Sequence, residues 1–155
     1  MLESAVASEV LRFVLVTVLA LAGLGKSLDQ PNARSLVIGS TELVMAVALA
    51  TGVLRVVFAV LAVAMTLAFL VHALAAPRDA RCACFGSRLP TIGRAGQRVR
   101  NTVLSTVAAV YLLLMNFPVP SESGALQLAA RVLGIGLGLS LVFVPWLIDY
   151  EGAPA

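Results

Sequence analysis

The two cysteines of this chain, Cys82 and Cys84, are separated by one residue in the segment Arg81-Cys82-Ala83-Cys84-Phe85-Gly86. A disulfide between them would close a ring of about eleven atoms, and residues at i and i+2 reach the Cα separation of a disulfide only if the backbone kinks. Such strain makes the bond easier to reduce, and closing so short a loop contributes little stability. The spacing therefore favours a redox-active pair over a structural cross-link.

Arginines surround the pair, at positions 78, 81 and 88. Positive charge favours the thiolate, which is the reactive form in disulfide exchange and in metal binding. Two other interpretations stay open. The thiolates could hold a soft metal such as copper(I) or zinc, or the cysteines could be inert small hydrophobes. Neither cysteine lies in an apolar run, which argues against inert packing.

Composition identifies an integral membrane protein. The 155 residues are 60% hydrophobic and 12% charged, and the mean hydropathy is +0.99. These values lie far from those of a soluble domain. The net charge of +3 does not indicate a nucleic-acid partner, because six of the eleven cations fall in one segment between apolar runs, residues 77–100. Charge in that position is typical of membrane orientation, so the expected partner is the lipid bilayer.

Five apolar segments are long enough to be transmembrane helices, for which about 17–25 residues are needed. They are residues 10–28, 36–53, 56–76, 102–119 and 126–148. The second and third are joined by a turn that Gly52 and Arg55 nearly fill, which predicts an antiparallel helical hairpin. The fifth contains Gly134 and Gly138, a spacing that lets helices approach closely. The expected fold is an all-α, multi-pass transmembrane helical bundle.

Each span carries the chain to the other side of the membrane, so the number of spans between two polar residues decides whether they lie on the same side and can meet. The loop after the first span, the loop after the third and the end of the fifth share one side of the membrane. Lys26 ends the first span on that side, Glu42 lies about two turns inside the second, and His72 lies one turn before the third ends. Arg100 and Asn101 open the fourth there. All five are expected near the cysteine pair.

Glu42 is the most informative of these residues, because an intramembrane carboxylate costs several kcal/mol unless it is paired. It is either a functional group or half of a structural ion pair with Lys26 or Arg34, and the two roles are compatible. His72 could carry the proton that thiol–disulfide exchange releases, or could be an interfacial polar tip. Arg100 could support the thiolates, or could orient the fourth helix at the lipid head groups.

The motifs together resemble the methylamine utilisation protein MauE family, a branch of the DoxX-like membrane proteins. They are Ala22-Gly23-x-x-Lys26, Glu42, Cys82-Ala83-Cys84-Phe85-Gly86 and Arg100-Asn101, and the resemblance spans roughly residues 11–115. The resemblance implies a four-helix core over residues 1–120, with the cysteine loop at 77–100, followed by a fifth helix and short tail over 121–155. It also implies disulfide handling with a thioredoxin-like partner, in maturation of the disulfide-rich small subunit of methylamine dehydrogenase and hence in methylamine metabolism.

The resulting hypothesis is a membrane thiol–disulfide redox protein. Its expected catalytic residues are Cys82, Cys84, Glu42 and His72, and its expected partner-contacting or thiolate-stabilising residues are Lys26, Arg81, Phe85, Gly86, Arg100 and Asn101. The sequence identifies no cofactor with certainty; a quinone follows only by analogy with vitamin K epoxide reductase-like proteins, which use C-x-x-C instead. The alternative is a non-catalytic module, either a membrane assembly factor or a soft-metal site for copper or zinc.

Charge counting and disulfide chemistry disagree about sidedness. The cysteine side carries eight cations, and the other side carries three, Arg12, Arg55 and Arg131. Arg12 and Arg131 are expected to snorkel to the interface. In a plasma-membrane protein the positive-inside rule places the cysteines in the cytoplasm. Disulfide formation for exported proteins would favour the outer face. The charge count favours the cytoplasmic assignment.

Overall fold

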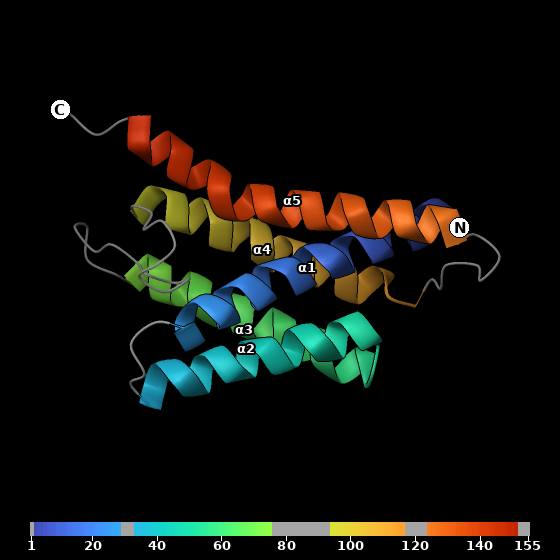
Figure 1. The fold of residues 1–155 in the computed structure, drawn as a ribbon, viewed down its shortest axis with the longest axis horizontal. Coiled ribbons are helices and arrows are strands. Elements are labelled where there is room, and N and C mark those ends of the chain that lie inside the picture. The colour runs from blue at the N-terminus through green and yellow to red at the C-terminus, as the bar shows by residue number, and fades with distance from the viewer. Residues whose placement is uncertain (1, 29–32, 76–93, 117–123, 152–155) are drawn as a thin grey trace.

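A computed structural model of the protein describes residues 2–28, 33–75, 94–116 and 124–151. These residues form helices and contain no strand: α1 (Leu2–Leu28), α2 (Ala33–Thr51), α3 (Arg55–Ala75), α4 (Arg94–Leu114) and α5 (Gly124–Glu151). Each helix runs antiparallel to the one before it (Figure 1). The prediction of an all-α helical bundle is confirmed.

Because the helices alternate in direction, different helix ends and connections lie at the two ends of the bundle (Figure 1). At one, which we name the loop end, α3 stops at Ala75 and α4 begins at Arg94, so this end holds both anchors of the segment that contains the cysteines. The ends of α1 and α5 also lie there. At the opposite end, which we name the turn end, Gly52 and Leu54 form the tight α2–α3 turn with φ of 76° and 47°.

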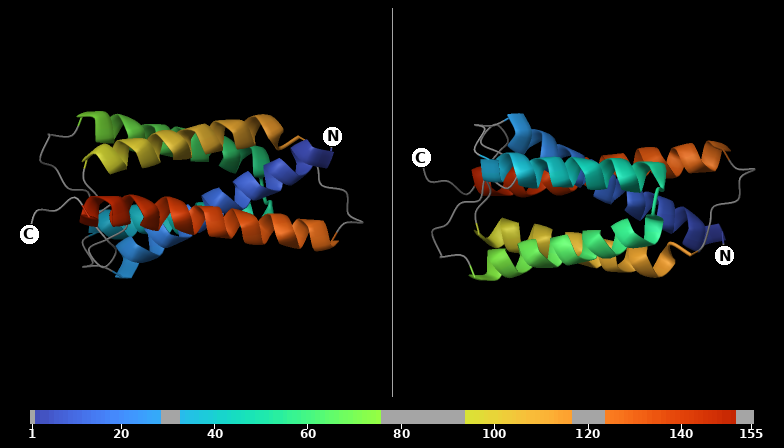
Figure 2. Two further views of the ribbon diagram at one scale, coloured as in Figure 1. Left: turned by 90° about the horizontal axis from the view of Figure 1, so that it is seen from above. Right: turned by 90° about the horizontal axis from the view of Figure 1, so that it is seen from below.

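Helix α1 is the centre of the bundle and contacts α2, α4 and α5, while α3 packs mainly on α4. Figure 2 shows α3 and α4 side by side, with α1, α2 and α5 forming the other layer. The core contains Leu15, Leu49 and Tyr111, with small residues such as Ala59 and Ala108 between them. Small side chains let helix backbones approach closely, which is a main source of helix packing in lipid.

Glycines mark the closest approaches to α1. A Cβ on Gly134 would lie 2.5 Å from the Val10 carbonyl oxygen, and one on Gly138 would lie 2.8 Å from Cβ of Thr17. The G-x-x-x-G spacing of the fifth helix is therefore an intramolecular contact between α5 and α1. Gly136 lies between the two, and a Cβ there would meet nothing within 4 Å.

In the part of the chain that the structure describes, three helices are long and apolar enough to cross a membrane, over Glu3–Leu28, Arg55–Ala75 and Gly124–Val144, and a shorter apolar helix covers Ser35–Thr51. Large apolar side chains are exposed on the outer faces of α2 and α3, including Val44, Val47, Val57 and Leu61. In a bundle of apolar helices such faces contact lipid. The multi-pass membrane assignment is supported, whereas α4, which at 21 residues is as long as α3, is less apolar than the three spans.

The predicted boundaries of the fourth helix are wrong at its start. Helix α4 begins at Arg94 and not near residue 102, so the expected loop over 77–100 includes the first two turns of a helix. The reason is burial, because Gln97, Arg100 and Asn101 lie inside the bundle at 2 to 4% exposure. Polar residues that pack against other helices extend α4 past the limit that hydropathy sets.

Candidate functional site

Glu42 and Lys26 form an ion pair between α2 and α1 near the loop end. Lys26 Nζ donates a hydrogen bond to Glu42 Oε1, and the Glu42 side chain is fully buried. Two glycines make the approach possible: a Cβ on Gly23 would lie 2.7 Å from the Gly39 carbonyl oxygen, and a Cβ on Gly39 would lie 2.9 Å from that of Gly23. The glycine of the Gly23-x-x-Lys26 motif therefore brings the lysine to its carboxylate.

The same lysine contacts a third helix. Lys26 Nζ lies 5.2 Å from the centre of the Phe69 ring in α3, within the range of a cation–π interaction. Asn101 of α4 then donates a hydrogen bond from Nδ2 to the Phe69 carbonyl oxygen at 3.1 Å. Glu42, Lys26, Phe69 and Asn101 thus form a continuous chain of contacts across α2, α1, α3 and α4. Phe69 is the member that sequence reasoning missed; its position one turn before His72 was the available signal.

Arg98 ties the ends of α3 and α4 together beside this chain. Its Nε and Nη2 donate to the carbonyl oxygens of Ala73 at 3.4 Å and of Leu74 at 3.2 Å. The last carbonyls of a helix have no partner within the helix, so these bonds cap α3. The cap fixes the two points between which the cysteine segment runs.

Arg100 and Asn101 do not open α4 and do not orient it at the head groups. Both lie in its second turn and are buried, at 3% and 4% exposure. His72 is exposed in the last turn of α3. The remaining site residues, Arg81, Cys82, Cys84, Phe85 and Gly86, lie outside the described residues, as does the side chain of Arg34. The structure therefore brings together Lys26, Glu42 and Asn101 and leaves His72 at the surface of the same end.

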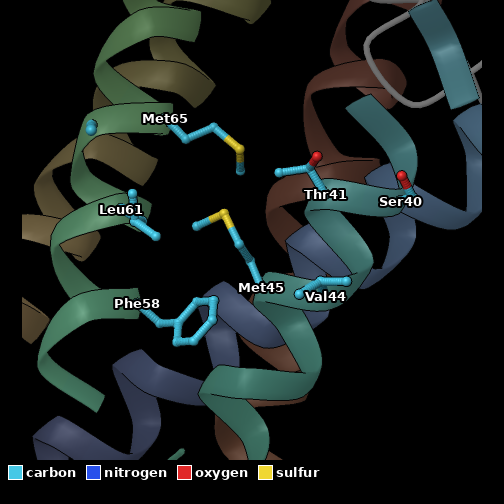
Figure 3. A pocket seen from close by; sticks show the side chains of 8 residues that line it. Ser40, Thr41, Val44, Met45, Phe58, Leu61 and Met65 are labelled. Atoms are coloured by element: carbon cyan, nitrogen blue, oxygen red, sulfur yellow. The ribbon is translucent and has the colours of Figure 1, made fainter. Parts of the chain in front are cut away.

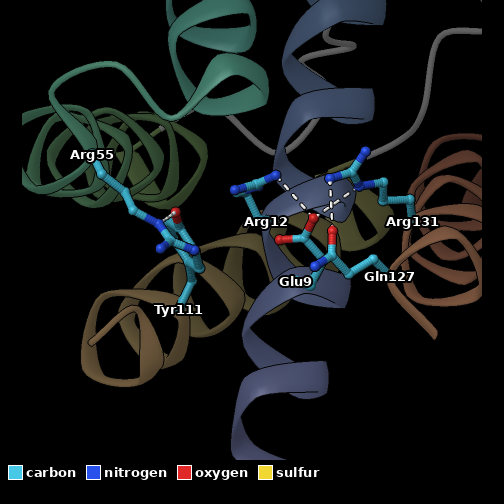
Figure 4. A network of polar contacts seen from close by, with 6 residues as sticks. All are labelled: Glu9, Arg12, Arg55, Tyr111, Gln127 and Arg131. Carbon is cyan, nitrogen blue, oxygen red and sulfur yellow. Dashed lines mark hydrogen bonds and ion pairs between the residues drawn. The ribbon is translucent and has the colours of Figure 1, made fainter. Parts of the chain in front are cut away.

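The turn end carries a second polar cluster that the sequence did not predict (Figure 4). Glu9 Oε1 accepts hydrogen bonds from Arg12 Nη2 and from Arg131 Nε, each at 2.9 Å. Nearby, Arg55 Nε donates to the Tyr111 hydroxyl at 3.3 Å. We name Glu9, Arg12, Arg55, Arg131 and Tyr111 the arginine cluster.

The cluster corrects one expectation. The Arg12 side chain is 11% exposed and does not snorkel to the interface, because Glu9 holds it inside the bundle; the Arg131 side chain, at 42%, reaches the surface and still contacts Glu9. The i,i+3 spacing of Glu9 and Arg12 was the signal that could have predicted this pair. Parity places Arg12, Arg55 and Arg131 on the same side of the membrane, and the structure places all three at the turn end.

A lateral groove separates α2 from α3 in the apolar part of the bundle (Figure 3). Its volume is about 560 Å³, and its lining is apolar except for two hydroxyl residues, Ser40 and Thr41. Both hydroxyls already donate to the Val37 carbonyl oxygen. Met45 and Met65 point into the groove from opposite helices. With no titratable lining residue, the groove supplies no acid or base to the candidate site.

Within the described ranges, no group of three histidine, cysteine, aspartate or glutamate side chains could hold a metal ion. The chemistry available at the loop end is therefore that of a buried carboxylate, an ammonium group and the three buried amide or guanidinium side chains of Gln97, Arg100 and Asn101, next to the anchors of the cysteine segment. Buried ionisable groups in membrane helices are functional candidates by default.

Comparison with known proteins identifies one family. The family model described as "Methylamine utilisation protein MauE" matches residues 31–114, which is more than half of the chain. The match includes α2, α3, α4 and the segment between α3 and α4 with both cysteines, and it excludes α1 and α5. No curated protein and no solved structure matches the chain.

Proposed function

Because this chain belongs to the methylamine utilisation protein MauE family, we propose that it is a membrane thiol–disulfide redox protein in which Cys82 and Cys84 exchange electrons with a thioredoxin-like partner. The observation that carries the proposal is the chain of contacts from Glu42 through Lys26 and Phe69 to Asn101. It joins a carboxylate of α2, an ammonium group of α1 and an amide of α4 through Phe69 of α3, at the loop end, where the cysteine segment is anchored.

The reaction is a two-electron exchange. One cysteine thiolate attacks a sulfur of the partner disulfide, which forms a mixed disulfide and releases the second partner sulfur as a thiolate. The other cysteine of the pair then attacks the mixed disulfide. The products are a Cys82–Cys84 disulfide and a dithiol partner, so the pair loses two electrons and two protons and the partner gains them. The reverse sequence reduces the pair and oxidises the partner.

Glu42 is suited to the proton part of this exchange. One of its carboxylate oxygens is bonded to Lys26, while Oε2 is buried and has no hydrogen-bond partner in the described part of the chain. An unsatisfied buried acceptor can take a proton without first breaking a hydrogen bond. Exposed His72 is the proposed route between this end and water. Arg81 and Arg100 contribute positive charge that favours thiolate forms, and Phe85 and Gly86 complete the surface that the partner recognises.

The experiment traps the cysteines in their cellular redox state. Membranes are quenched with acid and labelled with a mass-adding maleimide before and after reduction. Redox cycling predicts a mixture of oxidised and reduced protein, whereas a metal site predicts thiols that become reactive only after chelation. Cys82→Ser and Cys84→Ser should each abolish exchange at near-normal abundance, and one of them should accumulate a mixed disulfide with a thioredoxin-fold protein.

The double variant Cys82→Ser/Cys84→Ser is the matched control, since it lacks both the attacking and the resolving thiol and should trap nothing. Full activity in both single variants would overturn the redox function.

A further inference from the structure

The arginine cluster holds more positive charge than it neutralises. Its three guanidinium groups face one carboxylate, that of Glu9, so the described groups sum to three minus one, a net charge of +2. Arg55 and Arg131 both lie close enough to Arg12 for their charges to repel it. Figure 4 shows Arg12 between the Arg55–Tyr111 pair and the Glu9–Arg131 pair. Such repulsion is unfavourable unless a further anion offsets it.

The cluster also has more hydrogen-bond donors than acceptors. A single oxygen, Glu9 Oε1, accepts from both Arg12 and Arg131, and Gln127 Oε1 accepts a longer bond from Arg131 Nη2 at 3.4 Å. In the described residues, Arg12 Nε is buried without a hydrogen-bond partner, and Arg55 Nε donates to the neutral hydroxyl of Tyr111. A guanidinium group has five donors in a planar fork, and Arg12 Nε is a buried donor of this cluster that a further acceptor would satisfy.

The position of the cluster limits what that ligand can be. Arg55 is the first residue of α3, and Tyr111 lies about one turn before the end of α4. Two of the helices therefore begin or end at this level, which is where lipid head groups meet a membrane bundle. The Arg131 side chain, 42% exposed, opens the cluster to the outside.

We propose that the arginine cluster at the turn end binds a phosphate-type anion through the guanidinium groups of Arg55, Arg12 and Arg131. Phosphate oxygens accept paired N–H donors from arginine, and the ligand supplies the negative charge that Glu9 alone does not. Two sources share this chemistry, the headgroup of an anionic phospholipid and free inorganic phosphate. The site lies at the opposite end of the bundle from Ala75 and Arg94, where α3 ends and α4 begins, so it is independent of the redox proposal.

The test uses the full chain purified in an uncharged detergent and measures its thermal unfolding. The protein is titrated with phosphatidylglycerol, with zwitterionic phosphatidylcholine, and with inorganic phosphate against chloride at equal ionic strength. Stabilisation by phosphatidylglycerol alone identifies a lipid headgroup, and stabilisation by inorganic phosphate identifies a soluble ligand. Both outcomes support the site.

Variants assign the effect to the cluster. Arg131→Gln and Arg55→Gln should each weaken the apparent affinity about tenfold, which is the loss expected for one charge-assisted hydrogen bond. Arg98→Gln is the matched control, because it removes the same charge at the loop end and should leave the affinity unchanged. If Arg131→Gln does not fold because Glu9 loses its partner, Arg55→Gln still tests the site, since Arg55 bonds to the Tyr111 hydroxyl and leaves the Glu9 ion pairs intact. No stabilisation by either phosphate source, or an equal loss in Arg98→Gln, would overturn the proposal.

Discussion

Lys26 and Glu42 are paired across α1 and α2 with unequal burial: the carboxylate side chain is fully buried, while the lysine side chain is 13% exposed. The two residues are therefore not equivalent when one of them is removed. Loss of the lysine leaves a charge in an apolar interior, whereas loss of the carboxylate leaves a flexible cation that can extend towards the interface.

The first prediction follows from this asymmetry. Lys26→Leu should destabilise the protein by about 3–5 kcal/mol, the usual effect of leaving one charge of a buried pair without its partner. Glu42→Gln should cost less, about 1–2 kcal/mol, because the amide is neutral and still accepts a hydrogen bond. Thermal unfolding of the purified variants in detergent, together with their abundance in membranes, measures both effects.

The double variant Lys26→Leu/Glu42→Leu supplies the control. Removing both charges should recover most of the stability that Lys26→Leu loses, because no charge is then buried alone. Equal stability of all these variants would contradict the pairing of Lys26 with Glu42.

A second prediction concerns the contact of α5 with α1. Gly134→Ala should destabilise the bundle by about 1–3 kcal/mol, the usual range for overpacking, because the new Cβ would meet the backbone of Val10 at 2.5 Å. Gly136→Ala is a neighbouring control with open space around it, and alanine there should be neutral or slightly stabilising because it is the better helix former. Unfolding in a detergent series compares them directly. An equal loss of stability in Gly136→Ala and Gly134→Ala would show that the close approach of Gly134 to Val10 does not determine the effect.

The third prediction concerns the contact between α4 and α3. Asn101→Leu removes the donor to the Phe69 carbonyl oxygen and should cost about 1–3 kcal/mol. Thr102→Ala at the adjacent, exposed position should cost less than about 0.5 kcal/mol. Thermal unfolding again provides the measurement, and maleimide reactivity of the cysteines shows whether a looser anchor changes their exposure. Unchanged stability of Asn101→Leu would show that the hydrogen bond is not part of what holds the two helices together.

A fourth prediction concerns sidedness. In a Cys82→Ser/Cys84→Ser background, Leu28→Cys places a thiol at the loop end and Val53→Cys places one at the turn end; both positions are exposed. A membrane-impermeant maleimide applied to intact cells should label one of them and spare the other. In the wild-type protein, Cys82 and Cys84 should react with the maleimide under the same conditions as the thiol of Leu28→Cys. On the cation ratio of eight to three, we expect the loop end to be cytoplasmic and unlabelled until the cells are lysed.

Two controls complete the labelling experiment. Lysed cells show that every thiol can react, and the double serine parent shows the background. Labelling of Leu28→Cys in intact cells would reverse the absolute assignment, and equal labelling of Leu28→Cys and Val53→Cys would contradict the opposite placement of the two ends.

The sequence by itself determined the number of helices, their direction and the end at which each polar residue lies. Apolar runs of sufficient length define helices in a membrane protein because no other backbone arrangement of one segment satisfies its own hydrogen bonds in lipid. Direction then follows from parity, since each span reverses the chain. Lys26, Glu42 and Asn101, which the structure joins through Phe69, were therefore all predicted at the loop end from the sequence.

Tertiary structure alone decided which of those residues touch and where helix α4 begins. Lys26 reaches Glu42 because Gly23 and Gly39 let two backbones meet, and rotation of a helix about its axis is set by such packing, not by hydropathy. Burial of Arg100 and Asn101 extends α4 through residues that composition assigned to a loop. Hydropathy gives the average preference of each residue type for lipid or water. A polar residue that is hydrogen-bonded inside the bundle can be buried despite an unfavourable hydropathy.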